Sequence, residues 1–259
     1  MVDPRARIAE DVTIGPFCVV GPEVRIDSGT VLENNVTIRG RVTIGKNNQI
    51  FPGTVIGGEP QDLSYQGEDT EVVIGNNNII RELVTISRGT RKEDGITSIG
   101  DECYLMAACH VAHDCRIGDR VVIANGTLMG GHVHIHDDAT LSGAVVIHHF
   151  TTIGSYSFIG GQARVTIDVP PYMLVEGIPA RPRCVNVVAL KRNNFSAESI
   201  RALSEAHKLI YRSKVGLSNA REILRAGGFM LPAVNHLISY IETQQEGRHG
   251  RARERRRAA

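Results

Sequence analysis

The stretch Ile117-Gly-Asp-Arg-Val-Val-Ile123-Ala-Asn-Gly-Thr-Leu-Met129-Gly-Gly-His-Val-His-Ile135 carries an aliphatic residue at every sixth position. The same spacing extends on both sides of it and covers most of the first 165 residues. The series consists of Ile8, Ile14, Val20, Ile26, Leu32, Ile38, Ile44, Ile50, Ile56, Ile74, Ile80, Ile86, Ile99, Leu105, Val111, Ile117, Ile123, Met129, Ile135, Leu141, Ile147, Ile153, Ile159 and Val165. A period of six fits neither a helix of 3.6 residues per turn nor an uninterrupted strand. It predicts short strands separated by turns, each with one inward aliphatic residue.

Glycine, asparagine and aspartate crowd the positions after these aliphatic residues, as at Gly15, Gly45 and Gly118. These residue types are the ones that tight turns require. Three strand-and-turn units close a triangular coil of eighteen residues, and stacked coils pair through parallel hydrogen bonds about 4.8 Å apart. The sequence therefore predicts an all-β solenoid with a prism-shaped core over residues 1–170.

Two segments interrupt the series, and another composition follows its end. Residues 57–73 and 87–98 are expected to be loops, the places where a rigid solenoid usually carries its binding residues. Residues 171 to about 194 are expected to form an irregular connector, followed by helices, so that 171–246 make up a connector and helical domain. The expected helices are Phe195–Ser213 with Ser196 as N-cap, Ser218–Ala226, and Leu231–Gln245. The tail, residues 247–259, is expected to be disordered.

Composition narrows the class of protein. The 259 residues are 42% hydrophobic but only 5% aromatic, which suits thin layers of small branched side chains. Six arginines and one glutamate give residues 248–259 a charge of +5 within a net charge of +1, so the body carries −4. That balance argues against a nucleic-acid-binding body. With no long apolar run and an odd number of cysteines, a cytoplasmic protein with reduced thiols is expected.

Three cysteines, Cys103, Cys109 and Cys115, are spaced by six and resemble metal ligands. Together with Cys18, however, they occupy the fourth position after an aliphatic residue, where other repeats carry valine, threonine or alanine. They are therefore predicted to be small core residues on different faces of the prism, because a buried free cysteine behaves as a small hydrophobe.

The histidines form a different pattern. With eighteen residues per coil, His113, His132 and His148 fall on one edge of three successive coils, within one residue of the same column. None occupies an aliphatic position, so all three are expected to project outward. Imidazole is the side chain suited to proton transfer near pH 7, and the cluster therefore indicates a functional edge.

Two chemistries could use this edge. One is zinc chemistry like that of the β-helical carbonic anhydrases, in which histidines from neighbouring subunits bind the metal. The spacing of His113 and His149 resembles that family, but the companion ligand five residues further on would be Gly154. The other chemistry is acyl transfer with histidine as general base, which requires no metal.

Five segments point to one acyltransferase family. They are Gly58-Glu-Pro-Gln-Asp-Leu-Ser-Tyr-Gln-Gly-Glu68, Ile80-Arg-Glu-Leu-Val-Thr-Ile-Ser-Arg-Gly-Thr90, His110-Val-Ala-His-Asp-Cys-Arg-Ile-Gly118, Asp168-Val-Pro-Pro-Tyr172 and His207-Lys-Leu-Ile-Tyr-Arg212. Over its whole length the chain resembles the UDP-N-acetylglucosamine O-acyltransferases, which begin lipid A synthesis. The resemblance implies a left-handed parallel β-helix, a homotrimer with sites between adjacent prisms, and acyl carrier protein as donor of a long-chain 3-hydroxyacyl group. It implies no metal and no cofactor.

The resemblance also implies roles for individual residues. His113 corresponds to the general base, Asp114 to its orienting partner and the Gly131 N–H to the oxyanion donor. Gly161 corresponds to a position that limits acyl-chain length. The positions matched to substrate contacts are Asp62, Ser64, His110, His132, His148, His149, Asn186 and Arg192, the last two on the nucleotide side.

The chain departs from the family at several of its contacts. Ser64 replaces a usual lysine, Ser87 a histidine, His149 a glutamine, Val188 a glutamate and Asn193 an arginine. Because these changes affect the substrate and leave the His113–Asp114 pair intact, N-acylation of a UDP-2,3-diamino sugar is an alternative reaction. A non-catalytic scaffold is a third hypothesis, against which the intact pair speaks.

Overall fold

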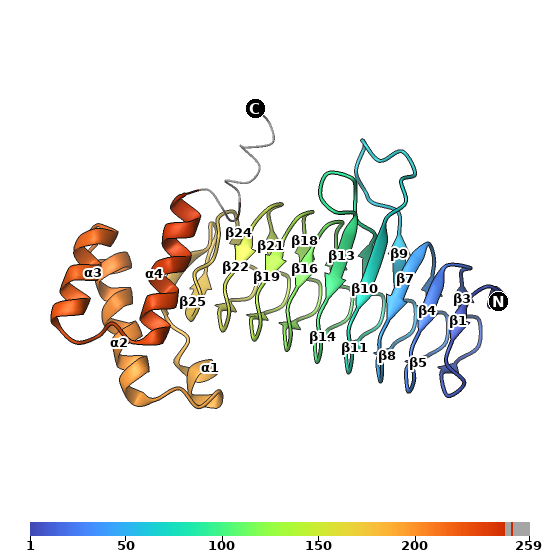
Figure 1. Ribbon diagram of the computed structural model, residues 1–259, viewed down its shortest axis with the longest axis horizontal. Coiled ribbons are helices and arrows are strands. Elements are labelled where there is room, and N and C mark those ends of the chain that lie inside the picture. The colour runs from blue at the N-terminus through green and yellow to red at the C-terminus, as the bar shows by residue number, and fades with distance from the viewer. Residues whose placement is uncertain (247–249, 251–259) are drawn as a thin grey trace.

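The computed structural model describes residues 1–246 and 250. The chain winds into a three-sided prism whose sides are parallel sheets, and a group of helices lies beyond its C-terminal end (Figure 1). Each coil contributes one strand to each side. We name the sides sheet A, sheet B and sheet C, and the chain visits them in the order B, C, A.

Sheet A contains β3 (Val19–Val20), β6 (Thr37–Ile38), β9 (Val55–Gly58), β12 (Thr85–Ser87), β15 (His110–Val111), β18 (Leu128–Met129), β21 (Val146–Ile147) and β24 (Arg164–Val165). Sheet B contains β1 (Arg7–Ile8), β4 (Val24–Ile26), β7 (Arg41–Ile44), β10 (Glu71–Ile74), β13 (Ile96–Ile99), β16 (Arg116–Ile117), β19 (His134–Ile135) and β22 (Thr152–Ile153). Sheet C contains β2 (Thr13–Ile14), β5 (Val31–Leu32), β8 (Gln49–Ile50), β11 (Ile79–Ile80), β14 (Tyr104–Leu105), β17 (Val122–Ile123), β20 (Thr140–Leu141), β23 (Phe158–Ile159), β25 (Met173–Glu176) and β26 (Arg181–Val185).

The six-residue series forms the core, as the sequence predicts. Its members from Val20 to Val165 are buried, while Ile8 and Ile14 in the first coil are only partly covered. The partner registers confirm an eighteen-residue coil, since His110 pairs with Leu128 and Leu128 with Val146. The two interruptions are somewhat shorter than expected, because strands continue into their ends: the loops span 59–70 and 88–95.

The four cysteines at core positions are confirmed as core residues. Cys18, Cys103, Cys109 and Cys115 are all buried and unpaired. The last three precede strands of sheets C, A and B respectively, so their side chains face different sides of the prism. Burial raises the pKa of the Cys103 thiol to about 11 and that of Cys115 to about 12. These thiols are inert filling of the core.

The expected irregular connector at 171–194 is wrong. β25 extends sheet C in parallel beside β23, and β26 returns antiparallel along β25. The short helix α1 (Val187–Arg192) follows. Val175 pairs with Ile159 and is buried like a member of the six-residue series. The prolines around this segment argued against a strand in the sequence. Proline is nevertheless compatible with strands at the edge of a sheet, which is where β26 lies.

The helices lie where the sequence predicts them. α2 (Ala197–His207) continues into a π-helical turn (Lys208–Arg212), and α3 (Leu217–Ala226) and α4 (Pro232–Gln245) follow. Ser196 caps α2, its side chain accepting a hydrogen bond from the Ser199 N–H. Within the described residues no helix is long and apolar enough to cross a membrane.

The expected disorder of 247–259 falls on residues outside the described part of the chain, with the exception of Gly250. The Gly250 N–H donates to Thr152 Oγ1 at 3.1 Å, so this one residue lies on the body of the protein. A side chain at this position would meet the Asp168 carboxylate, and only glycine permits the approach.

Candidate active site

The corner at which sheet A passes into sheet B, called here the A–B corner, carries most of the candidate residues. Both loops leave the prism at this corner, 59–70 between β9 and β10 and 88–95 between β12 and β13 (Figure 1). The turn with His113 and Asp114 follows in the next coil, between β15 and β16. Because sheet A pairs these coils in succession, the loops and the turn are stacked along one edge.

Asp114 is the most firmly held residue of the corner. Its side chain is fully buried, and Thr90 donates to both carboxylate oxygens, from N–H to Oδ1 and from the hydroxyl to Oδ2, each at 2.7 Å. The Asp114 N–H donates to Thr97 Oγ1. These donors fix the direction of the carboxylate.

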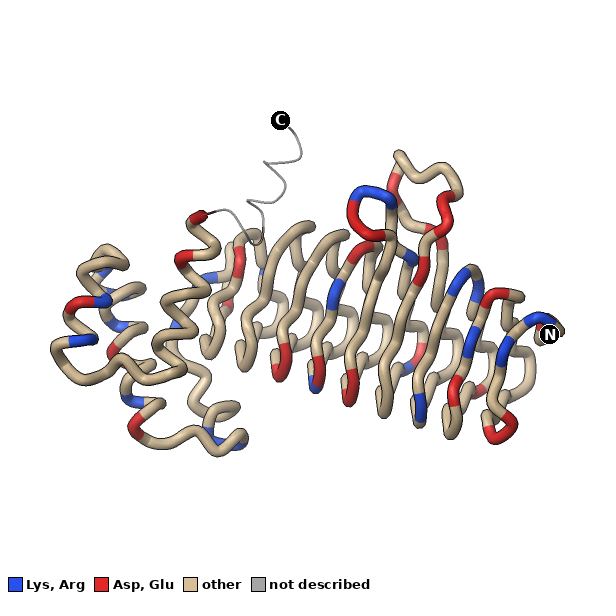
Figure 2. The backbone as a smooth tube through the Cα atoms, viewed as in Figure 1, with Lys and Arg blue, Asp and Glu red and all other residues tan. Residues whose placement is uncertain are grey.

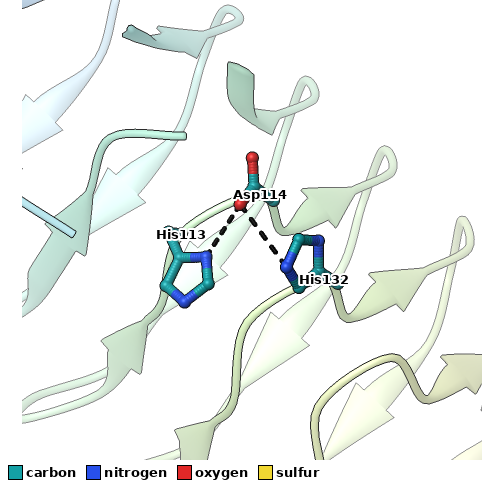
Figure 3. Close-up of side chains that lie close together, drawn as sticks. All are labelled: His113, Asp114 and His132. Atoms are coloured by element: carbon teal, nitrogen blue, oxygen red, sulfur yellow. Dashed lines mark hydrogen bonds and ion pairs between the residues drawn. The ribbon is translucent and has the colours of Figure 1, made fainter. Parts of the chain in front are cut away.

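His113 is oriented by this carboxylate (Figure 3). Its Nδ1 lies 2.7 Å from Asp114 Oδ2, so Nδ1 is the nitrogen that carries the proton in the neutral ring. Nε2 is then left as a proton acceptor. The side chain is 12% exposed, enough for Nε2 to meet a substrate group.

Gly131 lies under the His113 ring, one coil further along the corner. A Cβ at this position would come within 2.4 Å of His113 Cε1 and 2.7 Å of Nε2. Any larger residue would therefore displace the ring. The Gly131 N–H makes no hydrogen bond within residues 1–246 and 250, and it can be donated to a bound ligand.

His132 is packed into the corner and does not project freely outward as expected. It is 3% exposed, and its ring stacks on Phe150 with centroids 4.2 Å apart. Nε2 lies 3.7 Å from Asp114 Oδ2, and Nδ1 lies 3.4 Å from Glu93 Oε1. The ring meets His113 edge-on at 5.1 Å (Figure 3). His132 therefore forms the inner wall of the site.

The other histidines surround this pair. His110 lies on β15, with Nδ1 2.8 Å from Thr85 Oγ1; burial, helped by the nearby His113, lowers its pKa, and the ring is neutral near pH 7. His148 contacts His149 at 3.9 Å between ring centroids. By the register of sheet A, His149 occupies the position eighteen residues after Gly131, and His148 lies one residue outside that column.

Asp62 reaches the same place from loop 59–70. Its Oδ2 lies 3.9 Å from His113 Nε2, and its Oδ1 accepts hydrogen bonds from the N–H and the hydroxyl of Ser64. The Lys92 ammonium forms a salt bridge with Oδ2. Mainly because of that ammonium, the pKa of Asp62 is held below its ordinary value. The chain thus has a cation beside Asp62, although position 64 itself is a serine.

Asn186 and Arg192 are not part of the A–B corner. They line a cavity of about 460 Å³ on the outer face of sheet C, together with Arg120 and Asp138. The departing residues Val188 and Asn193 line the same cavity. Asn186 also caps α1 and donates to the Tyr156 carbonyl, so part of its role is structural.

The corner also contains a set of possible metal ligands. Nitrogen or oxygen atoms of His113, Asp114 and His132 lie within 4.8 Å of one another. In the zinc alternative, position 154 would carry a further ligand. No side chain fits there, because a Cβ on Gly154 would lie 2.4 Å from the Pro171 nitrogen.

Four residues of the corner escaped the sequence analysis: Thr90, Lys92, Glu93 and Phe150. Two of them could have been predicted. Thr90 ends a segment that carries the family resemblance, and Phe150 lies eighteen residues after His132 and hence on the same corner. Lys92 and Glu93 lie in a loop that interrupts the six-residue period, so the period could not predict where their side chains lie. Ser87, one of the departures, is buried in β12 beside Gly58.

Known proteins resemble the chain over nearly its whole length. A family profile described as UDP-N-acetylglucosamine O-acyltransferase, domain 2, matches residues 168–250, and the bacterial transferase hexapeptide repeat matches 5–40 and 96–131. The acyl-[acyl-carrier-protein]–UDP-N-acetylglucosamine O-acyltransferases of Thermodesulfovibrio yellowstonii and Halorhodospira halophila are 45% and 44% identical, each over 95% of this chain and 96% of the relative.

A solved structure agrees. The UDP-N-acetylglucosamine acyltransferase of Francisella novicida superposes with a TM-score of 0.88 at 40% identity, covering 93% of this chain and 89% of the other. The prism is accordingly the left-handed parallel β-helix expected from the resemblance. The chain belongs to the UDP-N-acetylglucosamine O-acyltransferase family.

Proposed function

We propose that the protein transfers a long-chain 3-hydroxyacyl group from acyl carrier protein to the 3-hydroxyl of UDP-N-acetylglucosamine, the reaction that begins lipid A synthesis. The observation that carries the proposal is the His113 ring, held at Nδ1 by Asp114 and lying across Gly131. A base, its orienting carboxylate and a backbone N–H are the three groups that acyl transfer to a hydroxyl requires.

In the first step, His113 Nε2 takes the proton of the sugar hydroxyl while the hydroxyl oxygen bonds to the thioester carbonyl carbon. The negative charge on the carbonyl oxygen is stabilised by the Gly131 N–H. Asp114 keeps the proton on Nδ1 and stabilises the imidazolium. When the C–S bond breaks, the imidazolium returns its proton to the departing thiolate, and ester and thiol are released.

We propose that the protein forms a homotrimer, and the placement of the site residues supports association of chains. In a three-sided coil, sheet C lies opposite the A–B corner, so one chain cannot bring Asn186 and Arg192 to His113. A neighbouring prism could supply the second group, as closed three-fold symmetry permits. The outer face of sheet A supports this: Leu128 and Val146, paired on adjacent strands, are 48% and 49% exposed and suit coverage by another chain.

We propose that the reaction uses no metal or cofactor. Asp114 Oδ2 already accepts hydrogen bonds from His113 and Thr90, and it lies 3.7 Å from His132 Nε2. Two ligand atoms of a tetrahedral zinc ion lie about 3.4 Å apart, whereas His113 Nδ1 and Asp114 Oδ2 lie only 2.7 Å apart, so zinc held by this pair would require their hydrogen bond to open. We also place the enzyme in the cytoplasm, where its unpaired cysteines would stay reduced.

The acyl chain has a path across sheet A. Gly161 lies at the turn from β23 to β24, at the corner between sheets C and A, and not on the corner of His113. A line between the two residues crosses the outer face of sheet A over Leu128 and Val146. The path is therefore oblique. Gly161 lies 48 residues after His113, or 48/18 coils, so the axial part of the path alone is roughly 13 Å at about 4.8 Å per coil.

Replacement of His113 by alanine should lower acyl transfer roughly 10²–10⁴-fold, because the hydroxyl loses its general base. The variant should keep its fold, since the ring contributes little to the core. Steady-state turnover, together with circular dichroism and the mass of the oligomer, checks both statements. A folded variant with near wild-type turnover would exclude His113 as the base.

Chelation tests the absence of a metal. EDTA should leave transfer unchanged, because every proton in the proposed steps moves between His113 and the substrates. The measurement is the initial rate before and after dialysis against EDTA, with metal content determined on the same samples. Loss of activity that zinc restores would contradict the metal-free mechanism and make His113, Asp114 and His132 the candidate ligands.

Gly161→Met should shift acyl preference toward chains shorter by about four carbons, since the new side chain occupies roughly 5 Å of the path. The position tolerates a side chain: it is exposed, and a Cβ would lie 3.5 Å from the Gly143 carbonyl oxygen and Ser142 Oγ. Competition among 3-hydroxyacyl carrier proteins of graded length, analysed by mass spectrometry, gives the profile. An unchanged profile in a folded, active variant would refute the path.

A further inference from the structure

Loop 88–95 is fixed to the A–B corner along its length. Thr90 donates twice to Asp114, Glu93 lies 3.4 Å from His132, and Asp94 forms a salt bridge with Arg116. Lys92 lies between these attachments. Its main chain is therefore held beside the site, within reach of the groups around His113.

The ammonium of Lys92 contacts Asp62 Oδ2, the oxygen that lies 3.9 Å from His113 Nε2. Asp62 is 12% exposed, and its other oxygen is held by Ser64. Loop 59–70 is held to loop 88–95 at a second point, where Arg88 donates to the Tyr65 hydroxyl at 2.9 Å. The two loops meet beside His113, and Figure 2 shows acidic residues on both loops and basic residues on loop 88–95.

We propose that Lys92 is a positioning residue for the acceptor: its ammonium holds the Asp62 carboxylate beside Nε2 of His113, in the place where it can accept a hydrogen bond from the sugar. The proposal rests on the proposed transfer to a UDP-sugar. A carboxylate on a loop can orient a hydroxyl only if its own direction is fixed, and a charge-assisted bond is the strong way to fix it.

Charge gives a second reason. Asp62, Asp114 and Glu93 place three carboxyl groups around His113 and His132, and the acceptor brings a negatively charged diphosphate. Lys92 offsets part of this negative charge at the side of the site that Asp62 occupies. The lowered pKa of Asp62, whose largest cause is the Lys92 contact, agrees with that arrangement. Loss of Lys92 should therefore weaken binding of the acceptor and spare the acyl donor.

The test compares three variants of the full-length protein with wild type in a transfer assay that uses UDP-N-acetylglucosamine and a 3-hydroxyacyl carrier protein. Lys92→Met should raise the acceptor KM roughly tenfold, with the donor KM unchanged and kcat within about threefold of wild type. Lys92→Arg should restore most of the loss. Arg91→Met removes the same charge from the neighbouring exposed residue, which has no hydrogen bond or salt bridge among the described residues, and should behave as wild type.

A relocated cation sharpens the test. The Ser64 hydroxyl lies 2.8 Å from Asp62 Oδ1, so a lysine at position 64 would reach the same carboxylate from the other side. Ser64→Lys in the Lys92→Met background should bring the acceptor KM back toward wild type.

The proposal is overturned if Lys92→Met leaves the acceptor KM unchanged, if Arg91→Met raises it equally, or if neither Lys92→Arg nor Ser64→Lys recovers it. Those outcomes are distinct from failure of the proposed function. If the function is wrong, wild-type protein itself acylates no UDP-sugar, whatever the residue at position 92.

Discussion

Parallel hydrogen bonding between successive coils fixes each residue relative to its partner in the next coil, which lies eighteen positions further along the chain wherever no loop intervenes. On sheet A this pairing joins His110 to Leu128 and Leu128 to Val146, and the turns that follow these strands stack in the same way. His113 therefore lies on Gly131, and Asp114 lies beside His132. The site is built from turns that repeat the same local geometry along one corner. In a coil that has no loop to absorb it, one residue more or less would turn the next strand over and separate His113 from the residues around it.

Much of this arrangement could be predicted from the sequence, because it depends on the period. The buried aliphatic series, the cysteines in the core and the shared corner of His113 and His132 all follow from counting by six and eighteen. The prediction failed where the period is broken or masked. β25 and β26 lie among prolines and carry no hexad, and Lys92 and Glu93 lie in a loop whose path the repeat does not determine. The burial of His132 depends on Phe150 and Glu93. The repeat places Phe150 beside His132, but it does not place Glu93, which lies in a loop. The corner that Gly161 occupies could have been found by counting. Gly161 lies 48 residues after His113, and residues on one corner are separated by multiples of 18.

The same prism separates the two halves of the proposed substrate site. The A–B corner carries the proposed base, His113, and the loop residues Asp62 and Lys92, while Asn186 and Arg192, at the two ends of α1, lie over sheet C. A three-sided coil keeps these groups apart within a chain, and association of chains is the simple way to unite them. On this account the exposed apolar residues of sheet A serve two purposes: they form part of the contact between chains and line the path of the acyl group. In this proposal the loops contact the polar acceptor and the face of the solenoid contacts the apolar donor.

The measurement that tests this account most directly is the identity of the product. The purified protein is incubated with a long-chain 3-hydroxyacyl carrier protein and with either UDP-N-acetylglucosamine or its 2,3-diamino analogue, and the products are weighed by mass spectrometry before and after mild alkali. The account predicts that UDP-N-acetylglucosamine gains one acyl group, that alkali removes it as expected for an ester, and that free carrier-protein thiol appears in equal amount. An alkali-stable amide formed with the diamino sugar alone, or no acylated nucleotide at all, would contradict it.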